Sequence, residues 1–456
     1  GRNARRIRTR GRRKIQIFLV RGLLFVIQKG RTMKFEPTLH KMPSGMTVIL
    51  DPMDLETTTI SVLFKTGARD ETPAEMGITH FCEHMLCKGT TRFPTPRAFD
   101  DFMDFNGGTK NAYTGNNALE LRGRILAENA NLLLDVFADQ LQNSLFDPEK
   151  IELERTVIKD ELRRASDKPE RQLKEFISGK LFNYATGSLR TLGTYETIDS
   201  FTRDQMLAFL QRRLSAQNCI ISVSGKIIDA DDMLNHITEK FAFLGTHFVP
   251  MNTSITYTPT VAHNLRPDDK NIKLRILFPD IWPLKYEYRF NNKCVGKFER
   301  FLGRQLFDVV RRENGLVYGL QMTGYGNEEF GVSGVETETA PENIERVVAL
   351  IAKTAHRVYT ENPITDDDLI RFTHKNKLGN ADWLESASQR MATLIGFYAD
   401  YDRLYDFYET NRMVDSIRRD DVIKNSRGYF DGAMSIITQG AAFSADLADI
   451  WHENFK

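Results

Sequence analysis

The chain has 456 residues, of which 41% are hydrophobic and 27% charged, and its formal net charge is +1. This length predicts two or three domains, and the apolar content is sufficient to build their cores. The four cysteines, Cys82, Cys87, Cys219 and Cys294, are too few and too irregularly spaced for a secreted disulfide framework. The composition therefore favours a soluble globular protein of a reducing compartment.

Although the formal net charge of the whole chain is close to zero, its N-terminal segment is strongly basic. Residues 1–32 contain eleven Lys and Arg and no Asp or Glu, so the remainder of the chain is acidic. Such a segment resembles a mitochondrial presequence, and its apolar runs, Ile15–Val20 and Leu23–Ile27, would also suit a membrane surface. Arg21 splits these runs, which argues against a spanning helix. We favour an upstream translated extension or the edge of a fragment, outside a fold that starts near Met33. The expected location is the cytoplasm, or the mitochondrial matrix if the segment is a genuine presequence.

The body alternates predicted strands and helices, which is the pattern of an α+β fold. The first half is expected to contain strands at Met46–Leu50 and Thr58–Lys65, a helix around His80, helices at Pro96–Phe105, Glu128–Ser144 and Pro148–Arg164, a strand at Asn218–Gly225 and a helix at Ala230–Phe241. A stretch rich in proline, threonine and asparagine, residues 247–271, is predicted to be a linker. The order then restarts with a strand at Ile272–Phe278, a helix at Phe298–Arg311, a strand at Gly331–Glu338 and helices at Pro341–Thr360 and Thr365–Leu378.

The most informative motif is His80-Phe81-Cys82-Glu83-His84. On a helix the two histidines lie one turn apart on the same face, so both imidazoles can reach one metal ion. Glu83 lies on the same arc, and the order H-x-x-E-H is typical of zinc hydrolases in which the glutamate is the general base. A chance match is the alternative. The motif also supplies only two ligands, and the remaining histidines show no metal-like spacing.

A candidate third ligand lies on the helix predicted to begin with Asp147 as N-cap and Pro148 as its first residue. Its apolar residues form one arc, and two carboxylates, Glu154 and Glu161, fall in the middle of that arc; the apolar members are Ile151, Leu153, Val157, Ile158 and Leu162. Carboxylates on a core-facing stripe are costly unless a partner compensates the charge.

Glu161 as a ligand, and Glu154 as an outer anchor for a ligand histidine, would meet that need. The alternatives are that both carboxylates form ion pairs with buried arginines, or that the arc is wider and more solvated than inferred. Cys82 points away from the histidines on a helical wheel. Cys87 lies on the metal-facing arc and is an alternative ligand to Glu161.

With these residues in place, the chain resembles the pitrilysin or insulinase-like zinc metallopeptidases. The resemblance is to their half-length branch, which includes the β subunit of the mitochondrial processing peptidase and bacterial relatives. Glu161 follows His84 at the spacing of this branch, and Thr66–Glu71 and Lys88–Pro94 also match family motifs. The resemblance covers most of residues 33–456. It implies two homologous domains, each a mostly antiparallel sheet flanked by helices.

On this basis the N-terminal catalytic domain is expected at residues 33–246, the linker at 247–271 and a homologous C-terminal domain at 272–456. The second half has no H-x-x-E-H motif, so one Zn²⁺ per chain is expected. The resemblance assigns its ligands as His80, His84 and Glu161.

Two further matches imply groups that contact a substrate. Asn111, Ala112 and Tyr113 resemble the family's active-site edge strand, along which an extended peptide pairs its backbone. Arg311 and Tyr318 match the pattern R-x-x-x-G-L-x-Y, whose arginine and tyrosine are thought to stabilise the oxyanion of the intermediate.

The resemblance implies a zinc metalloendopeptidase that cleaves unfolded or extended peptides, with Glu83 as general base. In this branch the chamber forms between two chains, so we expect a homodimer, or a heterodimer with a related subunit, and Arg311 and Tyr318 acting on the partner's zinc. The acidic body is expected to favour basic peptides. No nucleic-acid partner and no stable membrane insertion are expected. The alternatives are a non-catalytic scaffold subunit of the same fold and a hydrolase of small molecules.

Overall fold

The computed structural model describes residues 34–184, 190–248, 250, 255–326 and 330–456, and the backbone of two strands that precede them. These strands, Ile15–Val20 (β1) and Leu23–Gln28 (β2), pair antiparallel. The rest of the predicted basic extension, residues 1–32, lies outside the described residues. Within the described parts of the chain, no helix has the length and apolar character needed to cross a membrane.

The first half forms a six-stranded sheet with the order β3-β4-β9-β5-β7-β6. Its neighbours are antiparallel except β4 and β9, which are parallel. The strand β6 is at one end of this order, which confirms the prediction of an edge strand there. The strands are β3 (Thr38–Lys41), β4 (Thr47–Pro52), β5 (Thr57–Phe64), β6 (Gly108–Thr114), β7 (Leu119–Leu126) and β9 (Cys219–Gly225).

The second half forms a five-stranded sheet with the order β11-β15-β12-β14-β13, in which only β11 and β15 are parallel. The predicted linker, residues 247–271, contains β11 and also β10, which pairs with β8 of the first half. The domain boundaries stay a prediction. The strands are β8 (Phe182–Tyr184), β10 (Ile255–Tyr257), β11 (Val261–Leu265), β12 (Ile272–Pro279), β13 (Leu320–Gly326), β14 (Gly331–Thr339) and β15 (Ser435–Gly440).

Helices and strands alternate in a similar order in both halves: α1 and α2, or α9 alone, precede the sheet's hairpin, a series of helices follows it, and one helix follows the last strand of the sheet. This repetition confirms the predicted α+β architecture of two similar domains. The first half has α1 (Ile78–Leu86), α2 (Pro96–Phe105), α3 (Ala130–Asn143), α4 (Pro148–Ser166), α5 (Pro169–Leu181), α6 (Tyr195–Ser200), α7 (Arg203–Arg213) and α8 (Ala230–Lys240). The second has α9 (Arg289–Leu306), α10 (Ile344–Glu361), α11 (Asp366–Glu385), α12 (Ala387–Tyr401), α13 (Phe407–Ser416), α14 (Arg419–Ser426) and α15 (Leu447–Asn454).

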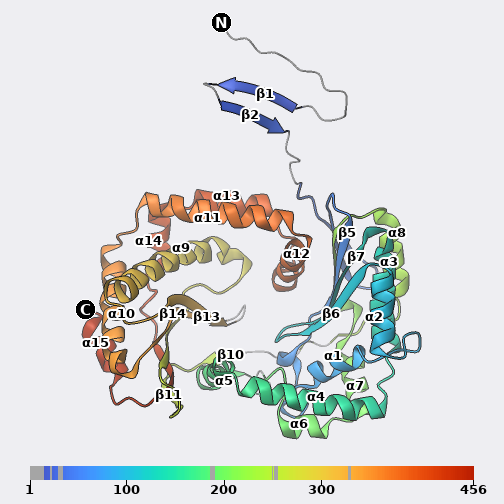
Figure 1. Ribbon diagram of the computed structural model, residues 1–456, viewed down its shortest axis with the longest axis horizontal. Coiled ribbons are helices and arrows are strands. Elements are labelled where there is room, and N and C mark those ends of the chain that lie inside the picture. The colour runs from blue at the N-terminus through green and yellow to red at the C-terminus, as the bar shows by residue number, and fades with distance from the viewer. Residues whose placement is uncertain are drawn as a thin grey trace.

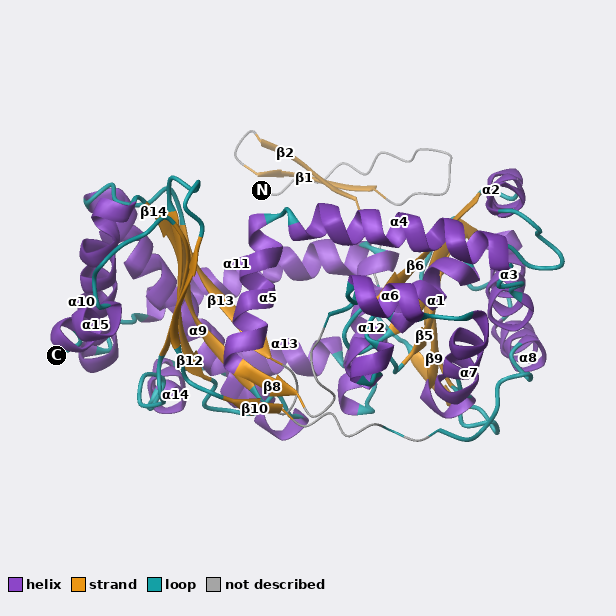
Figure 2. Cartoon of the chain, turned by 90° about the horizontal axis from the view of Figure 1, so that it is seen from below, coloured by secondary structure: helices purple, strands orange, loops and turns teal. Residues whose placement is uncertain are grey.

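Each half contributes one helix that packs on the sheet of the other half. One face of the first sheet packs on its own α2, α3 and α8, but the other face packs on α12 through Leu394 and Ile395. Reciprocally, α5 packs Leu173 and Ile177 on the second sheet, whose opposite face covers α9, α10 and α15. Figure 1 shows α4 and α5 leading from the first half to the second along one side, and α11 to α13 leading back along the other. Figure 2 shows α5 beside the strands of the second sheet. The exchange ties the two halves into one unit.

An ion pair without solvent exposure fixes α12 to the first sheet. Arg390 on α12 donates from Nε to Oδ2 of Asp51 on β4 at 2.7 Å, and its Nη2 donates to the other carboxylate oxygen. Both side chains are 0% exposed. The remaining guanidinium nitrogen donates to the carbonyl oxygen of Lys34 at 3.2 Å. Burial of two charges is tolerated here because the bidentate geometry satisfies both groups.

Removal of one partner of this pair should therefore lower the free energy of unfolding. Arg390→Ala leaves the Asp51 carboxylate buried and uncompensated, and we expect the free energy of unfolding to fall by about 3–5 kcal/mol. The double variant Asp51→Leu/Arg390→Met removes both charges and should recover most of this loss. Urea unfolding followed by tryptophan fluorescence measures both. Equal losses in the single and double variants would show that packing, and not the charge pair, holds α12 in place.

Candidate metal centre

The helix α1 is capped by a carboxylate that lies outside it. Its N-cap, Gly77, has a φ of 90° and no side chain to accept a hydrogen bond. Glu71 instead accepts from the backbone nitrogens of Gly77 at 2.7 Å and Thr79 at 2.9 Å. Burial raises the pKa of Glu71 to about 7, although these hydrogen bonds favour its ionised form. The capping role of Glu71 was not predictable from local sequence, because Glu71 lies several residues before the cap and no local capping pattern marks it.

The buried face of α1 directs the two histidines toward α4. Phe81, Cys82 and Met85 pack into an apolar cluster with Ile158 of α4 and residues of α7. Cys82 is buried, and its thiol donates to the carbonyl oxygen of Met206 at 3.7 Å, so it points away from the histidines as predicted.

His80, His84 and Glu161 converge between α1 and α4. Nε2 of His80 and Nε2 of His84 each lie 3.7 Å from the same carboxylate oxygen of Glu161. One donor atom from each of the three residues lies within 4.8 Å of the other two. This is the only such group of three or more potential ligands among the described residues. A tetrahedral ion with bonds of about 2.1 Å places its ligand atoms roughly 3.4 Å apart, so these residues fit a metal ion.

Cys87 is not part of this cluster. Its sulfur accepts a hydrogen bond from Nε2 of Gln140 at 3.6 Å. Burial raises the pKa of the Cys87 thiol, which disfavours the thiolate that a metal would require. The structure therefore favours Glu161 over Cys87 as the third donor.

The protonation of His80 suits metal binding. Burial, the proximity of His84 and the charge of Arg171 lower the pKa of His80 to about 3, which keeps its imidazole neutral. Nδ1 of His80 is buried and has no hydrogen-bond partner among the described residues. Neutral imidazole is the form that binds a metal.

Glu154 anchors the second histidine. Its Oε2 lies 2.8 Å from Nδ1 of His84, and its Oε1 forms an ion pair with Nζ of Lys88 at 2.7 Å. Burial tends to raise the pKa of Glu154, but the hydrogen bonds from His84 and Lys88 outweigh it and lower the pKa. An ionised Glu154 orients the His84 ring so that Nε2 faces Glu161.

The predicted apolar arc on α4 is wrong at two positions. Ile151, Ile158 and Leu162 are buried, but Leu153 and Val157 are 66% and 42% exposed. The buried stripe is therefore narrower than predicted, because α4 packs on α1 along one side only. Glu154 and Glu161 still face α1, and both meet histidines rather than the buried arginines of the alternative hypothesis.

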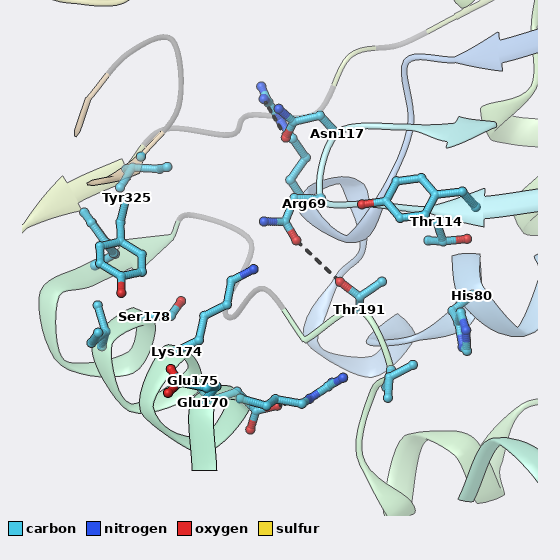
Figure 3. A pocket seen from close by; sticks show the side chains of 18 of the residues that line it. Arg69, His80, Thr114, Asn117, Glu170, Lys174, Glu175, Ser178, Thr191 and Tyr325 are labelled. Carbon is cyan, nitrogen blue, oxygen red and sulfur yellow. Dashed lines mark hydrogen bonds and ion pairs between the residues drawn. The ribbon is translucent and has the colours of Figure 1, made fainter. Parts of the chain in front are cut away.

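Glu83 is held at the border of a cavity. The hydroxyl of Thr114, on β6, donates to Oε2 of Glu83 at 2.6 Å. Burial raises the pKa of Glu83, partly offset by this hydrogen bond. The cavity has a volume of about 810 Å³ and is lined by His80, Glu83, the edge strand β6, the helix α5 and the end of β13. Figure 3 shows its lining, with His80 and Thr114 on one side and Tyr325 on the other.

The predicted edge-strand residues reach this cavity in part. Ala112 and Tyr113 line it, whereas Asn111 is not among the lining residues and accepts a hydrogen bond from the backbone nitrogen of Ala112 at 2.9 Å. Nearby, Asn116 and Asn117 also line the cavity.

Arg311 and Tyr318 do not reach the cavity of His80. They line a separate cavity of about 940 Å³ against the second sheet. Nε of Arg311 donates to the carbonyl oxygen of Tyr318 at 3.1 Å, and the Tyr318 side chain is 92% exposed. Within one chain, the structure therefore brings together His80, Glu83, His84, Glu154 and Glu161, but not the predicted arginine and tyrosine.

The chain belongs to the insulinase family, peptidase family M16. The model of that family matches residues 48–195, and the model described as the M16 inactive domain matches residues 200–373. The zinc protease YmxG of Bacillus subtilis is 31% identical over 353 residues, which are 76% of this chain and 85% of that protein. A probable mitochondrial-processing peptidase subunit beta of Arabidopsis thaliana is 29% identical over 220 residues, 48% of this chain and 41% of that protein. A solved protease from Helicobacter pylori shares the fold, with a TM-score of 0.76 at 16% identity over 89% of this chain and 99% of that chain.

The contact between His84 and Glu154 predicts a loss of metal affinity when the carboxylate is neutralised. Glu154→Gln keeps the size of the side chain but removes the charge that orients and polarises the ring. We expect zinc affinity, measured by competition with a chromogenic chelator, to fall roughly tenfold or more. Glu152→Gln on the same helix is the matched control, because Glu152 is exposed and pairs with Arg155. The same affinity in both variants would exclude the anchoring role of Glu154.

Proposed function

We propose that the protein is a zinc metalloendopeptidase that hydrolyses extended or unfolded peptides. The observation that carries this proposal is the convergence of His80, His84 and Glu161, of which His80 lines a cavity that Glu83 and the edge strand β6 also border. Two imidazoles and one carboxylate form a donor set found in catalytic zinc sites that keep a fourth position open. The naming of relatives as zinc proteases supports zinc as the metal.

A zinc ion held by these residues would supply a Lewis acid that polarises the scissile carbonyl and promotes ionisation of water. Glu83 acts as the general base: its carboxylate takes a proton from the attacking water and returns it to the leaving amine. Thr114 fixes Oε2 of Glu83 and so orients the carboxylate toward the cavity. Burial of Glu83 brings its pKa closer to neutral, which favours both halves of this proton transfer.

The peptide binds as an additional strand along β6. This strand is at the end of the first sheet, so one of its edges has no neighbouring strand within the described residues. Main-chain hydrogen bonds along the edge hold any extended sequence, and Ala112 and Tyr113 contact the side chains that face the cavity. A folded domain cannot present such an extended segment, so we expect unstructured peptides to be preferred.

A second chain completes the active site. Arg311 and Tyr318 line a different cavity from the one that His80 and Glu83 line, so within one chain they are not placed at the candidate zinc site. We infer that the active form is a dimer in which they stabilise the oxyanion at the partner's site. The partner is a second copy or a related subunit, as the naming of one relative as subunit beta suggests. The cytoplasm is the proposed location.

Substitution of the general base should separate metal binding from catalysis. Glu83→Gln keeps the ligands intact, so we expect zinc content near that of the parent and cleavage of an unstructured peptide reduced by about 10³-fold or more. Zinc analysis and peptide cleavage on the same sample measure this. Unchanged cleavage would exclude the role of Glu83. A parent chain that binds zinc but cleaves no peptide, alone or with a related subunit, would instead indicate a scaffold subunit.

Complementation tests the arrangement across two chains. Glu83→Gln and Arg311→Ala are each expected to abolish most activity in a homogeneous preparation. A heterodimer of the two contains one site with an intact Glu83 and a partner with an intact Arg311, so partial recovery of cleavage is expected. Arg312→Ala, which removes an exposed arginine paired with Asp308, is the control. Absence of recovery in verified heterodimers would exclude action in trans.

A further inference from the structure

The helix α5 forms one wall of the cavity that contains His80 and Glu83. Four of its charged residues line that cavity: Glu170, Arg171, Lys174 and Glu175. Because α5 also packs on the second sheet through Leu173 and Ile177, the helix backbone that carries these charged side chains is held against that sheet. The balance of their charges therefore determines which side chains of a bound peptide are accepted at this wall.

Glu170 is bound to the second sheet. Its carboxylate forms an ion pair with Lys273 and lies 3.5 Å from Nη2 of Arg275, both on β12. Lys273 and Arg275 also pair with Glu338 and Glu336 of β14. Glu170 is therefore part of an ion-pair network that joins α5 to the sheet.

Arg171 is held in place by the other carboxylate of this wall. Its Nε donates to Oε1 of Glu175, one turn along the helix, at 2.9 Å. Among the described residues, its two terminal nitrogens have no hydrogen-bond partner. A guanidinium anchored through Nε retains the pair of donors that binds a carboxylate most strongly. Arg171 and His80 line the same cavity.

Lys174 adds a second positive charge to the same wall. The side chain is exposed, and it forms no ion pair or hydrogen bond with any described residue. Figure 3 shows it extending from α5 into the cavity, with Arg69 and Thr191 on the facing side. Glu175 is paired to Arg171 and Glu170 is bound to the sheet, so Lys174 is the charge of the α5 wall that has no partner among the described residues.

We propose that Arg171 and Lys174 form a subsite for an acidic side chain, Asp or Glu, of the bound peptide. This inference rests on the proposed peptidase function and names its substrate class. The carboxylate of the peptide accepts hydrogen bonds from the terminal nitrogens of Arg171, while Lys174 supplies a mobile point charge. The cavity therefore favours acidic peptides, in contrast to the expectation from the acidic body of the chain, because charges near the bound peptide act more strongly than distant, screened ones.

Peptide binding tests this subsite independently of catalysis. Fluorescein-labelled unstructured peptides, in which Glu, Gln or Lys is placed at each position in turn, are titrated against the full chain carrying Glu83→Gln. At one position we expect Glu to bind about tenfold more tightly than Gln, the effect of roughly one charge-assisted hydrogen bond. Lys at that position should bind more weakly than Gln. The absence of any position that favours Glu would overturn the subsite.

Charge reversal on α5 identifies the residues responsible. In the same background, Lys174→Glu should reduce the preference for Glu at least threefold, and Arg171→Glu should convert it into a preference for Lys. Lys180→Glu is the matched control on the same helix, because Lys180 does not line the cavity. Lys174 has no partner to lose, so this variant remains informative even if Arg171→Glu fails to fold. An unchanged preference in Lys174→Glu and in any folded Arg171→Glu protein would overturn the proposal.

The failure of the subsite and the failure of the peptidase function give different results. Cleavage of the neutral parent peptide, without selective binding of Glu peptides, would remove the subsite and leave the proposed function intact. Selective binding of Glu peptides that depends on Lys174, without cleavage by the chain carrying Glu83, would leave the subsite and remove the peptidase function.

Discussion

The exchange of helices between the two halves is the constraint on which the rest of the structure depends. Neither sheet can bury both faces with helices of its own half, so α12 covers the first sheet and α5 covers the second. The ion pair between Arg390 and Asp51 specifies one position for α12, because any shift would leave two charges buried without partners. Apolar packing alone would permit neighbouring arrangements at little cost. The two halves therefore keep a fixed distance and orientation.

This constraint extends to the metal centre through α4 and α5. The two helices follow one another in the chain, and α4 supplies Glu154 and Glu161 while α5 covers the second sheet. The position of the second half therefore depends on α5, which directly follows α4, the helix that carries the candidate ligand Glu161. The same arrangement places a charged face of α5 beside His80, so contacts that stabilise the interface also set the electrostatic potential of the cavity. Glu170 belongs to both, since it lines the cavity and pairs with Arg275.

The local sequence predicted that His80, His84 and Glu161 converge, because these residues lie on two regular helices. The spacing of His80 and His84 fixes their common face, and the N-cap Asp147 fixes the phase that turns Glu154 and Glu161 toward α1. Leu153 and Val157 were misplaced because periodicity cannot tell how wide a contact a helix makes. The roles of Asp51 and Arg390 were not predictable, since the two residues are distant in sequence and only the exchanged position of α12 brings them together. The same holds for Arg171, whose importance depends on where α5 lies.

The two halves repeat one set of elements, yet among the described residues only the first brings together a candidate set of metal ligands between its equivalent helices. In the first half, α1 and α4 meet through His84, Glu154 and Glu161. In the second, α9 and α11 occupy the corresponding places in the chain order and meet through an ion pair between Arg304 and Asp368 at 3.0 Å. An arginine in this place satisfies the facing carboxylate without a metal, because it supplies the positive charge itself.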